Sequence, residues 1–268
     1  MTGTLPTIPL HYTEQGNGSP LVLLHGFPLN NLIWAETVRT LSDHYRVITP
    51  DLRGSGSSPF TDRSMYHMET LAEDVLALLD KLGIEKASIM GHSMGGYVTL
   101  ALWRLAPERF LSMGLVSTHA WADTDEGRKG REALAEKVFM NGSKEAADAM
   151  MPKMFAPETP SDESFIESVR AMMVATNPIS VVGMLRGMAA RPDSSSLLPD
   201  ITVPVAVLHG DHDALIPFHR AETMAAAMPD AVLFTIEQAG HMPMLEQPQA
   251  TAAAIRHFLS KALPDTRT

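Results

Sequence analysis

Cysteine is absent from the 268 residues of the chain. Disulfide bonds, thiolate metal sites and cysteine nucleophiles are thereby excluded together, so any chemistry must come from other side chains. Positive charge is scarce as well, because 21 Lys and Arg stand against 31 Asp and Glu and leave a formal net charge of −10. This charge opposes binding to phosphate backbones and anionic lipid surfaces, so no nucleic acid and no membrane is expected as a partner.

Long apolar runs are also missing. No stretch reaches the roughly 18 apolar residues that a bilayer-spanning helix needs. Residues 1–18 lack a basic segment followed by an apolar run, which is the pattern of a secretory signal. We therefore expect a soluble cytoplasmic protein. Apolar residues make up 45% of the chain and charged residues 19%, as in ordinary globular proteins, and the length suits one α/β domain with an insertion.

Short apolar runs that end near Gly or Pro alternate with longer segments of helical period. The runs that predict strands cover residues 21–24, 45–48, 87–90, 111–117, 205–209 and 231–236. Helical spacing of apolar residues occurs at 70–82, 96–105 and 249–259. This alternation predicts βαβ units and a mostly parallel sheet with at least these strands.

The alternation breaks between residues 121 and 195, where helical pieces follow one another without a convincing strand. Asn177 followed by Pro178 is typical of a helix start, with a capping side chain and then proline at the first helical position. We therefore predict an α/β core made of residues 1–120 and 196–268, with a helical insertion at 121–195.

One motif carries chemistry: residues 91–95 read Gly-His-Ser-Met-Gly and fit the pattern G-x-S-x-G. The motif stands directly after a predicted strand and directly before a predicted helix. In that context the turn holds the serine in a strained conformation with its hydroxyl above the sheet, and the glycines keep its neighbours from clashing. Ser93 is therefore the candidate nucleophile.

A serine hydroxyl is a weak nucleophile unless a base lies in hydrogen-bond reach and a third group orients that base. In this architecture the chain order is serine, acid, histidine, with both partners on loops after later strands. Asp213 follows the strand 205–209, and His241 follows the strand 231–236. Asp211 lies on the same loop and is the alternative acid. Asp213 is preferred because a residue further past the strand end can turn back toward the histidine.

The oxyanion of an acyl-transfer reaction needs backbone donors. The strand 21–24 runs into His25, Gly26, Phe27 and Pro28. Since Pro28 has no N–H, Phe27 is the better donor, and the N–H of Met94, which follows the nucleophile, is the expected second donor.

The chain resembles the α/β-hydrolase superfamily through five segments in family order. These segments are 25–28, 51–57, 91–96, 210–217 and 240–241. The resemblance implies an eight-stranded, mostly parallel sheet flanked by helices, with the insertion as a helical cap. Within the superfamily the chain is most similar to small capped serine esterases and to 3-oxoadipate enol-lactonase-like hydrolases. Relatives that are haloalkane dehalogenases or epoxide hydrolases carry aspartate at the position of Ser93, so both activities are disfavoured.

The segment 51–57 includes Asp51 and Arg53, and we interpret it as support for the floor of the site. The insertion holds eight of the 18 methionines, which fits either an adaptable apolar pocket or helix core. The residues expected to contact substrate are His25, Gly26, Trp121 and Met154.

The predicted function is hydrolysis of carboxylic esters with small to medium apolar acyl or aryl groups. An enol-lactonase or carbon–carbon bond hydrolase on the same triad is the alternative, followed by a non-catalytic ligand receptor. Apart from His209 and His212, which lack a third donor, the histidines show no metal-ligand spacing. We therefore expect no metal and no cofactor, and a small-molecule ester or lactone as partner. The oligomeric state does not follow from the sequence.

Overall fold

The computed structural model describes residues 6–159 and 163–263. Its centre is a seven-stranded sheet in the order β1-β3-β2-β4-β5-β6-β7. The strands are β1 Tyr12–Gln15, β2 Ser19–Leu24, β3 Tyr45–Pro50, β4 Ala87–His92, β5 Phe110–Val116, β6 Val205–Gly210 and β7 Ala231–Ile236. β1 pairs antiparallel with β3 and all other pairs are parallel. The predicted α/β fold with a mostly parallel sheet is confirmed, and the six predicted runs are β2 to β7.

β1 is the strand that the apolar pattern does not show. Its four residues are polar or aromatic and mostly exposed, as befits a short edge strand that is held by main-chain pairing to β3. The described residues form seven strands, one fewer than the eight that the resemblance implies. Upstream of β1 the backbone N–H groups of Ile8 and His11 donate to the side chains of Asp74 and Ser58 instead of to a neighbouring strand.

Ten α-helices are found within the described residues. They are α1 Ala35–Leu41, α2 Met68–Lys81, α3 Met94–Leu105, α4 Asp125–Asn141, α5 Lys144–Met150, α6 Glu163–Ala175, α7 Pro178–Ala190, α8 His219–Ala227, α9 Pro243–Glu246 and α10 Pro248–Ala262. The helices expected at 70–82, 96–105 and 249–259 correspond to α2, α3 and α10. No single helix of the described residues is long and apolar enough to cross a bilayer, although α6 from Ser164 and α7 meet that criterion as a pair, bent by 90°.

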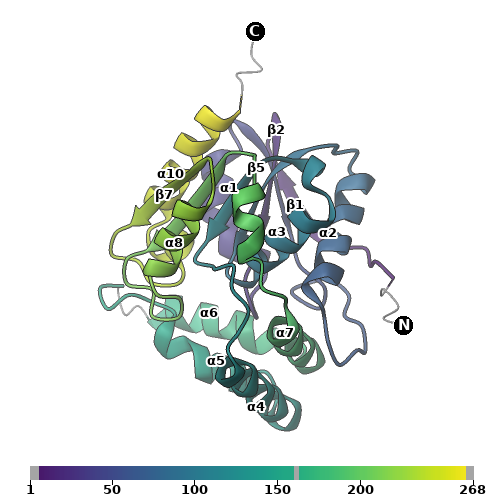
Figure 1. Cartoon of the computed structure of the whole chain (residues 1–268). Helices are drawn as coiled ribbons and strands as arrows, with labels where there is room; N and C mark the ends of the chain where they lie inside the picture. The colour runs from purple at the N-terminus through teal and green to yellow at the C-terminus, as the bar shows by residue number, and fades with distance from the viewer. Residues whose placement is uncertain (1–5, 160–162, 264–268) are drawn as a thin grey trace.

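Helices cover both faces of the sheet (Figure 1). In β2, Val22 and Leu24 belong to the core shared with α2, α3 and α8, whereas Leu21 and Leu23 belong to the core shared with α1 and α10. Successive strand residues point to opposite faces, so a strand that is covered on both faces must be apolar throughout. This requirement explains the uninterrupted apolar runs of the sequence.

Helices α4 to α7 lie between β5 and β6 in the chain and gather as one group at one end of the sheet (Figure 1). Local signals start two of them. The side chain of Asn177 accepts a hydrogen bond from Ile179 N, with Pro178 at the first position of α7, and Thr124 accepts one from Gly127 N at the start of α4. The helical insertion is therefore present in the structure, while its role as a separate cap domain stays a prediction.

Candidate active site

Ser93 stands between the last residue of β4 and the first residue of α3, with a φ of 52° and ψ of −113°. A positive φ is uncommon for any residue except glycine and persists only where the surroundings hold it. Here β5 and its following loop do so: Ser93 N donates to Val116 O at 2.9 Å, and Thr118 Oγ1 donates to Ser93 O at 2.8 Å. The fold therefore presents Ser93 in the strained turn that the motif predicts.

The glycines of the motif allow backbone to pack on backbone. A Cβ atom on Gly91 would lie 2.1 Å from Gly95 O, and one on Gly95 would lie 2.7 Å from Leu24 O. A Cβ on Gly26 would lie 2.6 Å from His92 Nδ1 and 3.1 Å from Ser93 Cβ. The missing side chain at Gly26 thus lets the turn after β2 approach the serine.

Asp213 and His241 meet although 28 positions separate them in the chain. Asp213 Oδ2 lies 2.8 Å from His241 Nδ1, and Asp213 Oδ1 accepts hydrogen bonds of 2.9 Å from the N–H groups of Leu215 and Ile216. Burial by itself would raise the pKa of Asp213, but His241 and the other partners outweigh it and hold the pKa below its ordinary value. Asp213 is therefore an ionised, oriented acceptor for the histidine.

Asp211, the alternative acid, faces elsewhere. Its Oδ1 accepts a hydrogen bond of 3.3 Å from Ala239 N and lies 3.6 Å from His212 Nδ1. Of the two acids, it is Asp213 that the structure brings to His241.

The loop that carries His241 is held by a carboxylate that the sequence analysis missed. Glu246 Oε1 accepts from Gly240 N at 2.9 Å and from Met242 N at 3.0 Å. Its Oε2 accepts from Ala156 N at 2.7 Å and from Thr159 Oγ1 at 2.5 Å. The sequence does offer a signal for such a carboxylate. An irregular loop that contains Gly and Pro leaves backbone N–H groups without secondary-structure partners, and these groups need acceptors. Glu246 ties the His241 loop to the insertion.

A second buried histidine supports the same loop. His92 Nε2 lies 2.8 Å from His241 O, and burial lowers the pKa of His92 to about 3. The ring is therefore neutral near pH 7, with Nε2 donating to the carbonyl group. His92 lies behind Ser93 as part of the support for His241.

The two expected oxyanion donors lie beside the serine. Met94 N is at the N-terminus of α3, directly after Ser93, and Phe27 follows the Gly26 turn. In the part of the chain that the structure describes, neither N–H donates a hydrogen bond to a protein acceptor. Two free N–H groups next to the candidate nucleophile suit a developing negative charge.

Ser93 and His241 open into a cavity of about 530 Å³. It is lined by Phe27, Ser93, Tyr97, His119, Asp123, Gly127, Gly130, Arg131, Leu134, Met150, Lys153, Leu185, Met188, Leu215, Ile216 and His241. The volume falls in the usual range of small-molecule sites, and most of the wall is apolar, with charged groups from the insertion.

The four expected substrate contacts do not line this cavity, and each has another place in the described structure. His25 is fully buried, because its Nε2 accepts from Leu52 N and its Nδ1 donates to Gly26 O, both at 2.9 Å. Met154 is also fully buried, and its carbonyl oxygen accepts from His241 N at 2.9 Å. Gly26 packs against His92, as described above. These three residues therefore lie in supporting positions outside the cavity lining, and their contact with substrate stays a prediction.

Trp121 is the remaining one of the four. Its ring packs under the guanidinium group of Arg220, whose Cζ lies 4.7 Å from the ring centroid, and its carbonyl oxygen accepts from Arg191. These contacts fix Trp121 at the start of the insertion. Its side chain is not part of the cavity wall.

Helix α4 supplies a cavity wall that the sequence analysis did not identify. Gly127, Gly130, Arg131 and Leu134 are spaced by three, one and three residues and so lie on one face of the helix. The spacing was visible in the sequence, but a helix face does not reveal what it faces until the fold is known.

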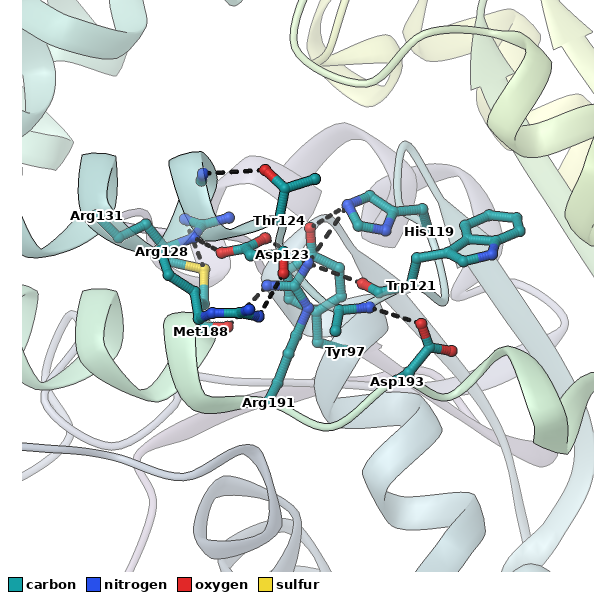
Figure 2. Close-up of polar contacts among 12 residues, drawn as sticks. Tyr97, His119, Trp121, Asp123, Thr124, Arg128, Arg131, Met188, Arg191 and Asp193 are labelled. Carbon is teal, nitrogen blue, oxygen red and sulfur yellow. Dashed lines mark hydrogen bonds and ion pairs between the residues drawn. The ribbon is translucent and has the colours of Figure 1, made fainter.

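A charged cluster adjoins this wall (Figure 2). Asp123 Oδ2 accepts from Arg131 Nε at 2.5 Å, and Asp123 Oδ1 lies 2.8 Å from Arg191 Nη2. Burial alone would raise the pKa of Asp123, but the two guanidinium groups hold it below its ordinary value. His119 completes the cluster, with Nε2 at 3.2 Å from Tyr97 Oη, and its pKa is lowered to about 3 by burial and by Arg191 and Arg220. Within the described residues, no group of three or more possible ligand side chains is arranged to hold a metal ion.

Comparison with known proteins places these features in a family. An esterase of Thermogutta terrifontis, solved with malate bound, is 37% identical and superposes with a TM-score of 0.92 over 94% of this chain and 93% of that chain. The enol-lactonase of Burkholderia xenovorans is 29% identical, with a TM-score of 0.87 over 94% of this chain and 96% of that one. The pimeloyl-[acyl-carrier protein] methyl ester esterase of Aliivibrio fischeri is 27% identical over 95% of this chain and 99% of its own length. Since the model of the alpha/beta hydrolase family matches residues 21–254, the chain belongs to that family of hydrolases.

Proposed function

We propose that the chain is a serine hydrolase that cleaves carboxylic esters of small to medium acyl or aryl groups. The observation that carries this proposal is the pair Asp213 and His241, joined at 2.8 Å, with His241 lining the same cavity as Ser93. An ionised carboxylate on Nδ1 leaves Nε2 of the imidazole free as a base. Residues 93, 213 and 241 are thus the proposed triad.

In the proposed mechanism, His241 accepts the proton of Ser93 while Oγ attacks the carbonyl carbon of the ester. The imidazolium ion, stabilised by Asp213, then gives the proton to the departing alcohol. Water, deprotonated by His241, attacks the acyl group on Ser93 and releases the acid. The N–H groups of Phe27 and Met94 stabilise both tetrahedral intermediates.

The cavity supports the size of the proposed substrate. A volume of about 530 Å³ holds an acyl or aryl group of moderate size, and Leu134, Leu185 and Met188 provide an apolar wall. The esterase of Thermogutta terrifontis was solved with malate, which supports a cavity for small carboxylic acid derivatives.

The proposal is tested by labelling with a fluorophosphonate and by hydrolysis of p-nitrophenyl esters of graded chain length. We expect wild type to be labelled and active, and Ser93→Ala to be neither. Ser117→Ala is the matched control, because Ser117 also follows a strand, has a φ of 44° and has no partner for its buried hydroxyl within the described residues. Full activity of Ser93→Ala, or failure of wild type to be labelled, overturns the proposal.

Lactone opening by the same triad is the second candidate, because the similarity to an enol-lactonase covers 94% of the chain. The acyl-enzyme chemistry is the same, except that the leaving alkoxide remains tethered to the acyl group. Titration of acid release from a panel of esters and enol lactones separates the two activities. A kcat/KM that is higher for lactones than for every ester assigns the chain to the second candidate.

A further inference from the structure

Two cations line the cavity that also holds Ser93 and His241. Arg131 belongs to α4, and Lys153 ends the short 3-10 helix Met151–Lys153. The protein as a whole carries a net charge of −10, so positive groups in this cavity are a local exception. Their partners decide whether they are neutralised within the protein.

Arg191 is buried and engaged through both of its terminal nitrogens. Its side chain is 4% exposed, donates to Met188 O at 2.7 Å and to Trp121 O at 3.0 Å, and lies 4.0 Å above the ring of Tyr97. Together with the contact of Nη2 to Asp123, these interactions engage both terminal nitrogens of Arg191 inside the protein. Arg191 therefore orders the cluster but offers nothing to a ligand.

Arg131 is engaged on one side only (Figure 2). Its Nε donates to Asp123, whereas Nη1 has only the sulfur of Met188 at 3.5 Å, a weak acceptor. Its Nη2 donates to no protein acceptor in the described parts of the chain, and the side chain remains 26% exposed. The outer edge of this guanidinium group is thus open to the cavity.

The charges of the cluster do not cancel. One carboxylate, Asp123, is shared by two guanidinium groups, Arg131 and Arg191, which leaves one positive charge in excess. Lys153 adds a second, since it has no ion pair with any side chain that the structure describes, which are those of residues 6–159 and 164–263. A guanidinium group with two free donors matches the two oxygens of a carboxylate.

We propose that Arg131, assisted by Lys153, forms a carboxylate-binding subsite, and that preferred substrates are esters or lactones whose non-reacting end carries a carboxylate. This inference rests on the proposed function, because it places the reacting carbonyl group at Ser93. The half-esters of dicarboxylic acids have this chemistry. Their methylene chain lies along the apolar wall of Leu134, Leu185 and Met188 between the two ends.

The test compares monomethyl and dimethyl esters of succinic, glutaric and adipic acids, with methanol release as the readout. Each monoester carries a carboxylate where its diester carries a neutral group of similar shape. We expect wild type to favour at least one monoester over its diester in kcat/KM by about tenfold or more, the low end of a charge-assisted contact. Arg131→Gln should lower this ratio by a similar factor. The ratio cancels any difference in the fraction of folded enzyme.

Lys129→Gln is the matched control, because Lys129 is an exposed residue of the same helix and its removal changes the net charge equally without altering the cavity wall. The ratio should keep its wild-type value in this variant. A wild-type ratio near one, an unchanged ratio in Arg131→Gln, or an equal fall in Lys129→Gln overturns the subsite.

Binding of the free dicarboxylates tests the subsite independently of the proposed hydrolytic function. If wild type cleaves neither ester of any pair, the proposed function fails, and calorimetric titration with succinate, glutarate and adipate then decides about the subsite alone. Binding that Arg131→Gln weakens about tenfold and Lys129→Gln leaves unaltered supports it. Absence of binding to wild type, or equal binding to wild type and Arg131→Gln, overturns it.

Discussion

His241 and Asp213 lie on the loops after β7 and β6, two adjacent parallel strands, and their side chains meet at 2.8 Å. Parallel neighbours end at the same edge of a sheet, so residues just past the two strand ends can touch despite their separation in the chain. The carboxylate of Asp213 is further held by the amides of Leu215 and Ile216. The sheet therefore brings the two loops together, and the carboxylate of Asp213 orients the imidazole.

We expect Asp213→Asn to lower kcat for ester hydrolysis by about 10⁴-fold, because an amide stabilises the wrong tautomer of the base. Asp211→Asn is the control on the same loop and should retain kcat within about threefold, since that carboxylate contacts Ala239 and His212 instead. Steady-state kinetics on one p-nitrophenyl ester measure both. A larger loss for Asp211→Asn than for Asp213→Asn would contradict the assignment of the acid.

Glu246→Ala should lower kcat by about 10²-fold, because misplacement of a catalytic group by about 1 Å costs this much. The variant removes the acceptor of four donors, two of which flank His241. Glu246→Gln retains one acceptor oxygen and should recover part of the rate. Gln247→Ala is the neighbouring control. If Glu246→Ala alters stability but leaves kcat unchanged, Glu246 has no positioning role.

Protonation of His92 should couple stability to pH. Its pKa is 6.5 in the unfolded chain and about 3 in the fold, lowered by burial. Between these values the unfolded state binds one more proton, so the free energy of unfolding decreases as pH falls, by about 1.4 kcal/mol per pH unit. Above pH 6.5 the contribution is complete. Urea unfolding at pH 7 and pH 5 should therefore show a stability gap between wild type and His92→Gln that narrows by about 2 kcal/mol at the lower pH.

A gap of equal size at both pH values would show that the fold does not lower the pKa of His92. His257→Gln provides the comparison, since His257 is an exposed histidine on α10. The gap between this variant and wild type should not narrow in the same way.

Gly95→Ala and Gly130→Ala should have opposite effects on stability. A Cβ on Gly95 would approach the carbonyl oxygens of Leu24 and His25 to 2.7 Å, and backbone atoms there cannot move without separating β2 from α3. A Cβ on Gly130 meets nothing within 4 Å. We expect Gly95→Ala to lower the free energy of unfolding by about 2 kcal/mol or more. Gly130→Ala, in a helix interior, should raise it by about 0.5 to 1 kcal/mol. Similar values for the two variants would refute the close packing at the turn.

Much of the fold could be predicted from the sequence because it depends on local patterns. Strands that are buried on both faces must be continuously apolar, as in β2, and a G-x-S-x-G turn needs its glycines where backbones touch, as at Gly91 and Gly95. Edge strand β1 was not predicted, because it is held by main-chain pairing with β3, and such pairing leaves no apolar pattern in the sequence.

The sequence by itself determined the residue types at the strand ends, and so nominated Ser93, Asp213 and His241, because the order of parallel strands brings their carboxyl ends to one edge. Only the tertiary structure decided that Asp213 rather than Asp211 meets His241, that His25 is buried and that Glu246 holds the His241 loop. It also decided that Arg131 is open to the cavity while Arg191 is not. The physical reason is that hydrogen bonds and burial depend on distances of a few ångströms between segments far apart in the chain, which a one-dimensional pattern does not contain.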